Sequence, residues 1–329
     1  MHRNLGLGFT FGLILSSVLA VSKPATAAGL TIGYSDWPGW VAWQVAIDKS
    51  WLKEAGVDVT FQWFDYSASM DAYSAGKIDA DLVTNGDGLV TGAAGGKGIM
   101  IMLTDYSNGN DMIVGKPGVK TLKDLKGKKV GIETGLVEHL LLLNGLKGAG
   151  MSEKDVTLVN AKTNETPQVL ASGQVDAIGA WQPVSGSAMK ALPGSRPIYT
   201  SAQAPGLIYD VLYASPASLS AHRADYVKLA KVWDHVVSYI NDPKTQDDAV
   251  KIMSARVGLT PAAYKPLLHG THLIGLAEGK KTYGKADGLT SLYGSSKIAD
   301  DFNVKNEVYK AAQDIDGAID PSVTNDALK

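Results

Sequence analysis

The segment Ser74-Ala-Gly-Lys-Ile-Asp-Ala80 gives the strongest indication of the fold. A closely similar segment, Ala171-Ser-Gly-Gln-Val-Asp-Ala177, follows in the second half of the chain. In each copy a helical segment reaches a Gly, and a strand with Ile or Val followed by Asp and Ala comes directly after it. Gly just beyond a helix end adopts the left-handed backbone conformation at little cost, so local structure explains each copy. The recurrence of the whole pattern predicts two similar α/β lobes.

Strands and helices alternate around both copies. Around the first copy we expect strands at 30–34, 57–63, 78–83 and 98–104, with helices at 41–55 and 67–76. Around the second copy we expect strands at 130–132, 156–159 and 177–180, with helices at 137–146 and 166–172. A turn-rich stretch at 193–205 precedes a return strand at 208–214, and mostly helical sequence follows. Such alternation predicts parallel sheets with crossover helices.

The order of these segments predicts the domain organisation. We expect the chain to cross between lobes near Gly115 and again at 204–208. Lobe I would then comprise residues 29–114 plus 208–329, and lobe II residues 115–207. The predicted fold class is α/β, with two doubly wound lobes joined by a hinge.

The N-terminus has the pattern of a cleavable export signal over residues 1–27. Arg3 supplies the positive charge, Leu5 to Val21 forms an uncharged apolar run, and Ala25-Thr-Ala27 is a processing site. The alternative is a membrane anchor, but glycines and serines dilute the run, and Lys23 and Pro24 follow it. We expect cleavage after about Ala27 and a periplasmic mature protein.

Composition excludes several functional classes. The hydrophobic content of 45% is that of a globular protein with well-filled cores. The formal charge is −2 and the lysines are scattered, so no basic surface for nucleic acid is expected. The chain has no cysteine, which rules out disulfides, thiolate metal sites and a lipid-bearing Cys after the signal.

The chain resembles the periplasmic binding proteins of nitrate, sulfonate and taurine ABC importers, which also resemble thiamine-pyrimidine synthesis proteins. The matching segments are Ile32-Gly-Tyr34 with the Trp loop after it, Gly76–Ala80, Leu122-Lys-Asp-Leu-Lys-Gly-Lys-Lys-Val-Gly131, Gly173–Ala177 and Trp181-Gln-Pro183. The resemblance implies a type II periplasmic binding protein, a Venus-flytrap fold that binds solute between its lobes. Within the family the chain is most similar to a branch associated with urea carboxylase and guanidine use. The cysteine-rich segment of the pyrimidine-synthesis relatives is absent here, so their activity is not implied.

The segments that follow strands identify candidate ligand residues, because ligands of doubly wound sheets lie at the carboxyl ends of strands. These segments are rich in acids and aromatic residues and contain no Lys or Arg. Carboxylates and aromatic faces together suit a small cation such as guanidinium, whose flat fork pairs with a carboxylate. The predicted ligand-binding residues are Asp36, Trp37, Trp40, Asn85, Asp87, Asp111, Glu133, Thr134, Trp181, Tyr209 and Asp210.

Structural roles compete with ligand binding at several of these positions. Asp36 and Asp87 are equally well explained as N-caps of helices. Asp111 could simply begin a strand, Trp40 could belong to the core, and Trp181 could pack the lobes together. Three further acids, Asp65, Asp105 and Glu138, are expected to be solvated.

The leading hypothesis is a receptor that captures guanidinium or a related small cation and delivers it to an inner-membrane ABC permease with its cytoplasmic ATPase. The alternatives are a neutral urea-, amide- or aminopyrimidine-like solute, a sulfonate or nitrate anion, and a periplasmic sensory binding module. The histidines share no metal-ligand spacing, and neither a Gly-x-Ser-x-Gly motif nor a phosphate loop is present. We therefore expect no enzyme activity, no cofactor and no metal, and we expect a monomer.

Overall fold

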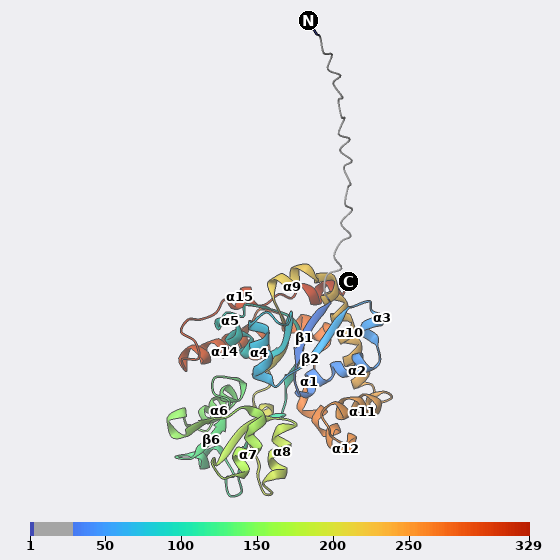
Figure 1. Ribbon diagram of the computed structural model, residues 1–329. Coiled ribbons are helices and arrows are strands. Elements are labelled where there is room, and N and C mark those ends of the chain that lie inside the picture. The colour runs from blue at the N-terminus through green and yellow to red at the C-terminus, as the bar shows by residue number, and fades with distance from the viewer. Residues whose placement is uncertain (3–28) are drawn as a thin grey trace.

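The computed structural model describes residues 1–2 and 29–329. The expected signal peptide, residues 1–27, lies outside the described residues apart from Met1 and His2. The described chain forms two lobes of unequal size, with α9 and α10 on the larger lobe and α6, α7 and α8 on the smaller one (Figure 1). Each lobe is built around its own β-sheet.

The larger lobe contains a six-stranded sheet with the order β11-β4-β10-β3-β1-β2. Its strands are β1 (Leu30–Tyr34), β2 (Val59–Trp63), β3 (Ala80–Thr84), β4 (Ile99–Ser107), β10 (Tyr209–Ala214) and β11 (Thr271–Leu273). β1 runs parallel to β2 and β3, but β10 runs antiparallel to both β3 and β4. The prediction of parallel sheets is therefore wrong in part, because the strand that returns from the smaller lobe enters this sheet in the opposite direction.

The smaller lobe contains a five-stranded sheet with the order β7-β6-β8-β5-β9. Its strands are β5 (Asp111–Gly115), β6 (Lys129–Ile132), β7 (Thr157–Asn160), β8 (Ala177–Trp181) and β9 (Arg196–Thr200). β5 is antiparallel to its neighbours β8 and β9. β9 lies where the sequence predicts only turns. Pro197 misleads the prediction, since proline is tolerated in an edge strand such as β9.

The first helical segment of the larger lobe is broken. In place of one helix over 41–55, the chain forms α1 (Pro38–Val41), α2 (Trp43–Asp48) and α3 (Trp51–Glu54). Ser50 has a φ of 61°, a left-handed conformation that ends a right-handed helix. α4 (Tyr66–Ser74) and α5 (Asn85–Ala93) then follow β2 and β3 in the expected order.

Helices from the C-terminal part of the chain cover the larger sheet. They are α9 (Pro216–Ala221), α10 (Arg223–Asn241), α11 (Gln246–Arg256), α12 (Pro261–Tyr264), the 3-10 helix η5 (Lys265–Gly270), α13 (Leu276–Thr282), α14 (Leu292–Lys305), α15 (Ile315–Ala318) and α16 (Ser322–Ala327). Trp233 of α10 packs on Trp43 of α2 with ring centroids 5.0 Å apart, and both side chains are fully buried. Within residues 29–329, no helix combines the length and the apolar character needed to span a membrane.

The smaller lobe carries its own helices. They are the 3-10 helices η1 (Leu122–Leu125), η2 (Glu153–Asp155) and η3 (Thr163–Glu165), together with α6 (Val137–Gly148), α7 (Thr166–Ala171) and α8 (Val184–Ala191). α7 and the repeat copy at 171–177 lead into β8, as the sequence predicts.

Two segments connect the lobes: 108–110 between β4 and β5, and 201–208, which includes η4 (Ser201–Gln203), between β9 and β10. The predicted crossing near Gly115 is wrong, because Gly115 ends a strand of the smaller sheet, whereas 204–208 lies within the second crossing. The Ser201 hydroxyl lies 2.6 Å from that of Ser107 and accepts a hydrogen bond of 2.7 Å from the Gly109 N–H. Side-chain hydrogen bonds thus hold the two connections against each other.

Candidate functional site

Three adjoining spaces lie between the lobes. The central one, here called the inner cavity, contains about 220 Å³ of space between protein atoms, part of which is open to solvent. Its lining residues are Trp37, Trp40, Tyr66, Thr84, Asp111, Val137, Trp181, Ile208 and Asp210. Tyr66 and Trp181 separate it from an outer chamber of about 440 Å³. On another side, Thr84, Val137 and Ile208 are shared with a mostly apolar back pocket of about 250 Å³.

Aromatic side chains form much of the wall of the inner cavity. Trp37 and Trp40 are placed by α1, which begins at Pro38 with its preset backbone angle. The Trp40 and Tyr66 rings lie 5.2 Å apart at 32°, and the Trp181 ring meets Tyr66 edge-on at 5.3 Å. The buried Trp40 Nε1 has no hydrogen-bond partner among the described residues. The cavity therefore offers π faces and one free donor to a small flat solute.

Two acids of the smaller lobe lie together at this side of the molecule, one of them in the cavity wall, and we call them the smaller-lobe pair. Asp111 begins β5 and is 3% exposed; Glu138 lies in the first turn of α6 and is 0% exposed. Within the described residues, no donor reaches Asp111 Oδ2 or either oxygen of Glu138. The two carboxyl groups nevertheless lie close enough for each to act on the pKa of the other. Gly179 makes room for this arrangement, since a Cβ there would lie 2.9 Å from that of Glu138.

Burial sets the ionisation of the smaller-lobe pair. It raises the pKa of Asp111 to about 6, and burial together with the Asp111 charge raises the pKa of Glu138 well above its usual range. The dipole of α6 favours an ionised acid in its first turn by only about 0.3–1 kcal/mol. Desolvating a charge costs roughly several kcal/mol, so burial outweighs the dipole. One member of the pair must carry a proton near neutral pH.

The larger lobe contributes a matching pair, here called the larger-lobe pair. Asp105 on β4 and Asp210 on β10 lie opposite each other in the antiparallel register, at 0% and 1% exposure. Asp105 accepts a hydrogen bond of 2.8 Å from Trp37 Nε1 and one of 2.9 Å from the Thr104 hydroxyl. Asp210 Oδ2 has no donor among the described residues.

The donors decide which member of the larger-lobe pair is ionised. Burial raises the pKa of Asp105 to about 6 despite its hydrogen bonds. Burial and the Asp105 charge raise the pKa of Asp210 well above its usual range. Asp105 is therefore the ionised member, and Asp210 is a neutral acid near neutral pH. Gly39 is needed beside this pair, because a Cβ there would overlap the Asp105 carboxylate.

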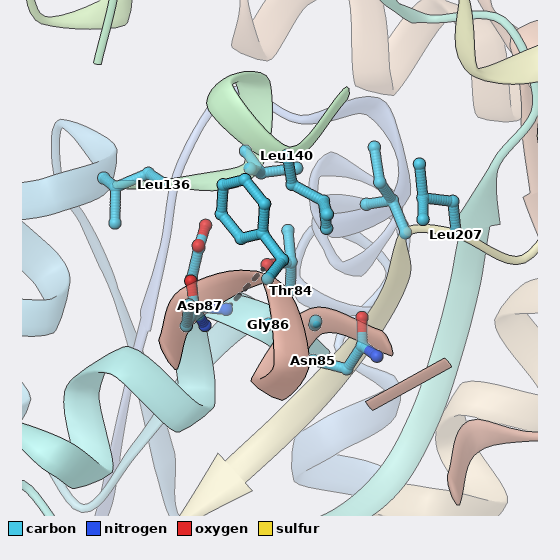
Figure 2. Close-up of a pocket in the computed structure, with 12 residues that line it drawn as sticks. Thr84, Asn85, Gly86, Asp87, Leu136, Leu140 and Leu207 are labelled. Carbon is cyan, nitrogen blue, oxygen red and sulfur yellow. Dashed lines mark hydrogen bonds between the residues drawn. The ribbon is translucent and has the colours of Figure 1, made fainter. Parts of the chain in front are cut away.

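Asp87 lies one layer behind the aromatic wall. It accepts a hydrogen bond of 2.8 Å from the Tyr66 hydroxyl, and burial raises its pKa to about 7. Figure 2 shows the first turn of α5, with Thr84 and Asp87, facing Leu136 and Leu140 near the start of α6. The N-cap interpretation is wrong for Asp87, because Thr84 caps α5 by accepting from the Asp87 N–H at 3.1 Å.

The outer chamber has a different chemistry. Asp36 accepts a hydrogen bond of 2.9 Å from Trp181 Nε1, which joins the two lobes, and burial raises the pKa of Asp36. The N-cap interpretation fails here too, since Trp37 occupies that position of α1. Glu133 accepts from the N–H and hydroxyl of Thr163, both at 3.3 Å. Lys162 also lines this chamber, and Asp65 is exposed there, as the sequence predicts.

The structure brings only part of the predicted set together. Trp37, Trp40, Asp111, Trp181 and Asp210 line the inner cavity. Asp36 and Glu133 line the outer chamber, and Asn85 and Asp87 line the back pocket. Asn85 is held by Ser295, Ser296 and the Tyr209 N–H, Tyr209 donates its hydroxyl to the Leu289 carbonyl, and Thr134 is exposed.

The sequence analysis missed two acids of the site. Asp105 and Glu138 were expected to be solvated, and both are fully buried instead. A signal was available for Glu138, which stands within the apolar run Leu136 to Leu142 at the start of a helix. Asp105 directly follows the apolar strand residues Ile99 to Leu103 and Thr104. An acid inside or beside such a run is expected to be buried, since the helix or strand is covered on more than one face.

The described residues contain no group of three or more side chains suited to hold a metal ion. The side chains that line the inner cavity bring carboxyl groups, aromatic rings and the indole of Trp40. Such a set can accept hydrogen bonds, stabilise positive charge and stack a planar group. It presents no basic side chain to a negative charge.

Comparisons with known proteins agree with this architecture. Residues 37–243 match the family described as NMT1/THI5 like. A binding protein of Brucella abortus is 29% identical over 165 residues, which cover 50% of this chain and 51% of that protein. The chain thus spans about half the length of these curated relatives.

Solved structures share the fold at low identity. The alkanesulfonate-binding protein SsuA of Xanthomonas axonopodis, bound to MOPS, superposes with a TM-score of 0.75 at 18% identity, covering 89% of this chain and 98% of its own. The periplasmic nitrate-binding protein NrtA of Synechocystis superposes with a TM-score of 0.73 at 11% identity, covering 91% and 88%. The fold is therefore that of a type II periplasmic binding protein, as predicted. Within that class, the chain belongs to the NMT1/THI5-like family.

Proposed function

We propose that this protein is the solute-binding receptor of an ABC importer, and that its solute is a small planar cation, with guanidinium the leading candidate. The solute would lie in the inner cavity, and the segments 108–110 and 201–208 would form the hinge. After export to the periplasm the loaded receptor would deliver its solute to a membrane permease. The observation that carries the proposal is the set of buried carboxyl groups that both lobes present without any basic partner.

The charge of the inner cavity argues against an anion. Related folds are named for binding sulfonate and nitrate, but here Asp111 and Asp210 line the cavity and no Lys or Arg does. Two like charges 4 Å apart repel by about 4 kcal/mol at an effective dielectric constant of 20. An anion would meet that repulsion, whereas a cation gains a comparable attraction.

The hydrogen-bonding groups favour a donor-rich solute. Asp111 Oδ2 and Asp210 Oδ2 are buried without donors among the described residues, and an unsatisfied buried acceptor costs about 1–3 kcal/mol. A guanidinium ion carries N–H groups on every edge and can serve acceptors from both lobes at once. Its flat faces suit the rings of Trp40, Tyr66 and Trp181.

A neutral urea-like solute is the second candidate, and one observation favours it. Asp210 lines the cavity as a neutral acid, so the wall of the larger lobe carries no charge that would favour a cation over a neutral solute. The aromatic walls would stack such a solute equally well. Urea and guanidinium have nearly the same shape, so their charge and the one edge where urea has an acceptor oxygen distinguish the two candidates.

The test is a binding panel on purified mature protein that has been unfolded and refolded to remove any solute carried through purification. Guanidinium chloride, urea, taurine and nitrate are compared by calorimetry and thermal shift at constant ionic strength, with sodium chloride as the control. A ligand at a hundredfold excess over Kd should stabilise the protein by about 2.7 kcal/mol. We expect guanidinium alone to do so at millimolar concentration. Stabilisation by taurine or nitrate, with none from guanidinium, would overturn the proposal.

A further inference from the structure

Glu138 is fully buried near the inner cavity, yet it is absent from the cavity lining. It stands behind Asp111, against Gly179 of β8, and cannot reach the solute except through its neighbour. Neither of its oxygens has a donor among the described residues. A carboxyl group in this position needs a hydrogen-bond partner. If it is neutral it must donate to an acceptor, and if it is ionised it must accept from a donor.

Among the titratable groups around Glu138, Asp111 is the one that can share a proton with it. Of the elements packed against α6, β5 presents Asp111 and β8 carries no titratable side chain. The remaining titratable groups on α6, β9 and η1 are His139, Lys147, Arg196, Tyr199, Lys123 and Asp124. Arg196, Lys123 and Asp124 are exposed, Tyr199 donates to Asn144, and His139 contacts the Gly135 N–H and Glu153. From α5, Asp87 adds a further negative charge.

We propose, resting on the function proposed above, that Glu138 is a positioning residue. As a neutral acid it donates one hydrogen bond to Asp111, holds one Asp111 oxygen, and leaves the other for an N–H group of the solute. Asp111 is then the ionised carboxylate that faces the solute from the smaller lobe.

Geometry supports this assignment over the reverse one. Asp111 lines the cavity, where the solute's positive charge can compensate its own, whereas Glu138 lies outside the lining. The Ser107 hydroxyl beside Asp111, which accepts from the Asp111 N–H at 3.3 Å, also lowers the pKa of Asp111, while the charges of Asp111 and Asp87 both raise the pKa of Glu138. The pair thereby presents a single negative charge to the solute, which suits a monocation.

The experiment compares Glu138→Gln, Glu138→Leu and Asp111→Asn by calorimetric titration with guanidinium chloride. Gln retains a donor to Asp111 and carries no charge, so we expect E138Q to bind within about threefold of the parent at pH 7.5. E138L leaves Asp111 without that donor, and D111N removes the ionised group, so both should lose about 30-fold or more. A loss in E138Q as large as that in D111N would show that Glu138 is itself an ionised ligand and would overturn the proposal.

A second measurement needs no solute. The carbonyl stretch of a protonated carboxylic acid, followed by infrared difference spectroscopy between parent and E138Q at pH 7.5, reports the Glu138 proton directly. We expect the parent to show this band and E138Q to lack it. Loss of a carboxylate band instead would refute the proposal even if E138Q bound normally. Should guanidinium fail to bind the parent, the proposed function fails, while the infrared result still decides the state of Glu138.

Discussion

Each of the two carboxyl pairs joins one acid in the wall of the inner cavity to one acid behind that wall. The pairs differ in which of these two acids is ionised. In the larger-lobe pair, the member away from the cavity, Asp105, holds the charge because Trp37 and Thr104 donate to it. In the smaller-lobe pair, Glu138 has no such donors, and the charge falls to Asp111 at the cavity wall. The hydrogen-bond donors behind a carboxyl pair, and not the presence of the pair, therefore determine which wall of the site is charged.

The largest expected effect comes from removing the charge at the smaller-lobe wall. Asp111→Asn should weaken guanidinium binding by about 2–5 kcal/mol, because the solute's charge would remain buried beside a neutral amide. Calorimetry measures the loss. Asp65→Asn, in the exposed part of the outer chamber, is the matched control and should change affinity less than twofold. Equal losses in the two variants would end the distinction between inner cavity and outer chamber.

The second-largest effect is expected in the pH dependence of guanidinium binding. Burial raises the pKa of Asp111 and of Asp105 to about 6, so both acids take up protons as the pH falls through 6. A group with a pKa of 6 is only about one-tenth ionised at pH 5, and a cation binds the ionised form. Affinity should therefore fall about tenfold or more between pH 7.5 and pH 5.0. A flat profile over this range would favour the neutral, urea-like solute.

A smaller effect is expected from the contact between the lobes. Trp181→Phe keeps a ring against Tyr66 but deletes the N–H that donates to Asp36. One net hydrogen bond is worth about 0.5–1.5 kcal/mol, so affinity should fall about two- to tenfold, mainly through faster dissociation. Stopped-flow kinetics would detect this. Trp51→Phe, at a ring that packs on His235 of the same lobe, is the control and should leave the dissociation rate unchanged.

The smallest change in guanidinium affinity is expected at Asp210, because this residue of the larger-lobe wall is already neutral. Asp210→Asn replaces a neutral acid by a neutral amide that can still donate to Asp105, so guanidinium affinity should change by less than about threefold. The same measurement on Asp111→Asn gives the contrast directly. If D210N is as damaging as D111N, the charge lies on both walls and the assignment of Asp210 fails.

Much of the architecture was predictable from local patterns. The repeated Gly-x-Ile/Val-Asp-Ala pattern correctly predicted two α/β lobes, and alternating segments located most helices and strands of residues 30–181. The direction of β10 was not predictable, because it depends on where the returning chain meets the other sheet. β9 was missed since its proline, Pro197, suggests a turn, and only the edge position of the strand makes that proline acceptable.

The kinds of side chain in the candidate site were predictable from the sequence, but the exact set of residues was not. Loops with acids and aromatics and without basic residues pointed to Trp37, Trp40, Asp111, Trp181 and Asp210, which do line one cavity. Spacing along the chain could not show that Asn85 and Tyr209 are used to hold helix α14 and the segment near Leu289. Nor could it show that Asp105 and Glu138 are buried, because their covering comes from the other segments that pack on them.

The Ser201 hydroxyl, which bonds to both Ser107 and Gly109, has a mechanical consequence. Because it joins the two connections, neither can twist while the other stays still without breaking a hydrogen bond. A rotation of one lobe on the other is therefore expected to move both connections together. In the receptor proposed above, a membrane partner that touches one connection would therefore respond to the movement of both.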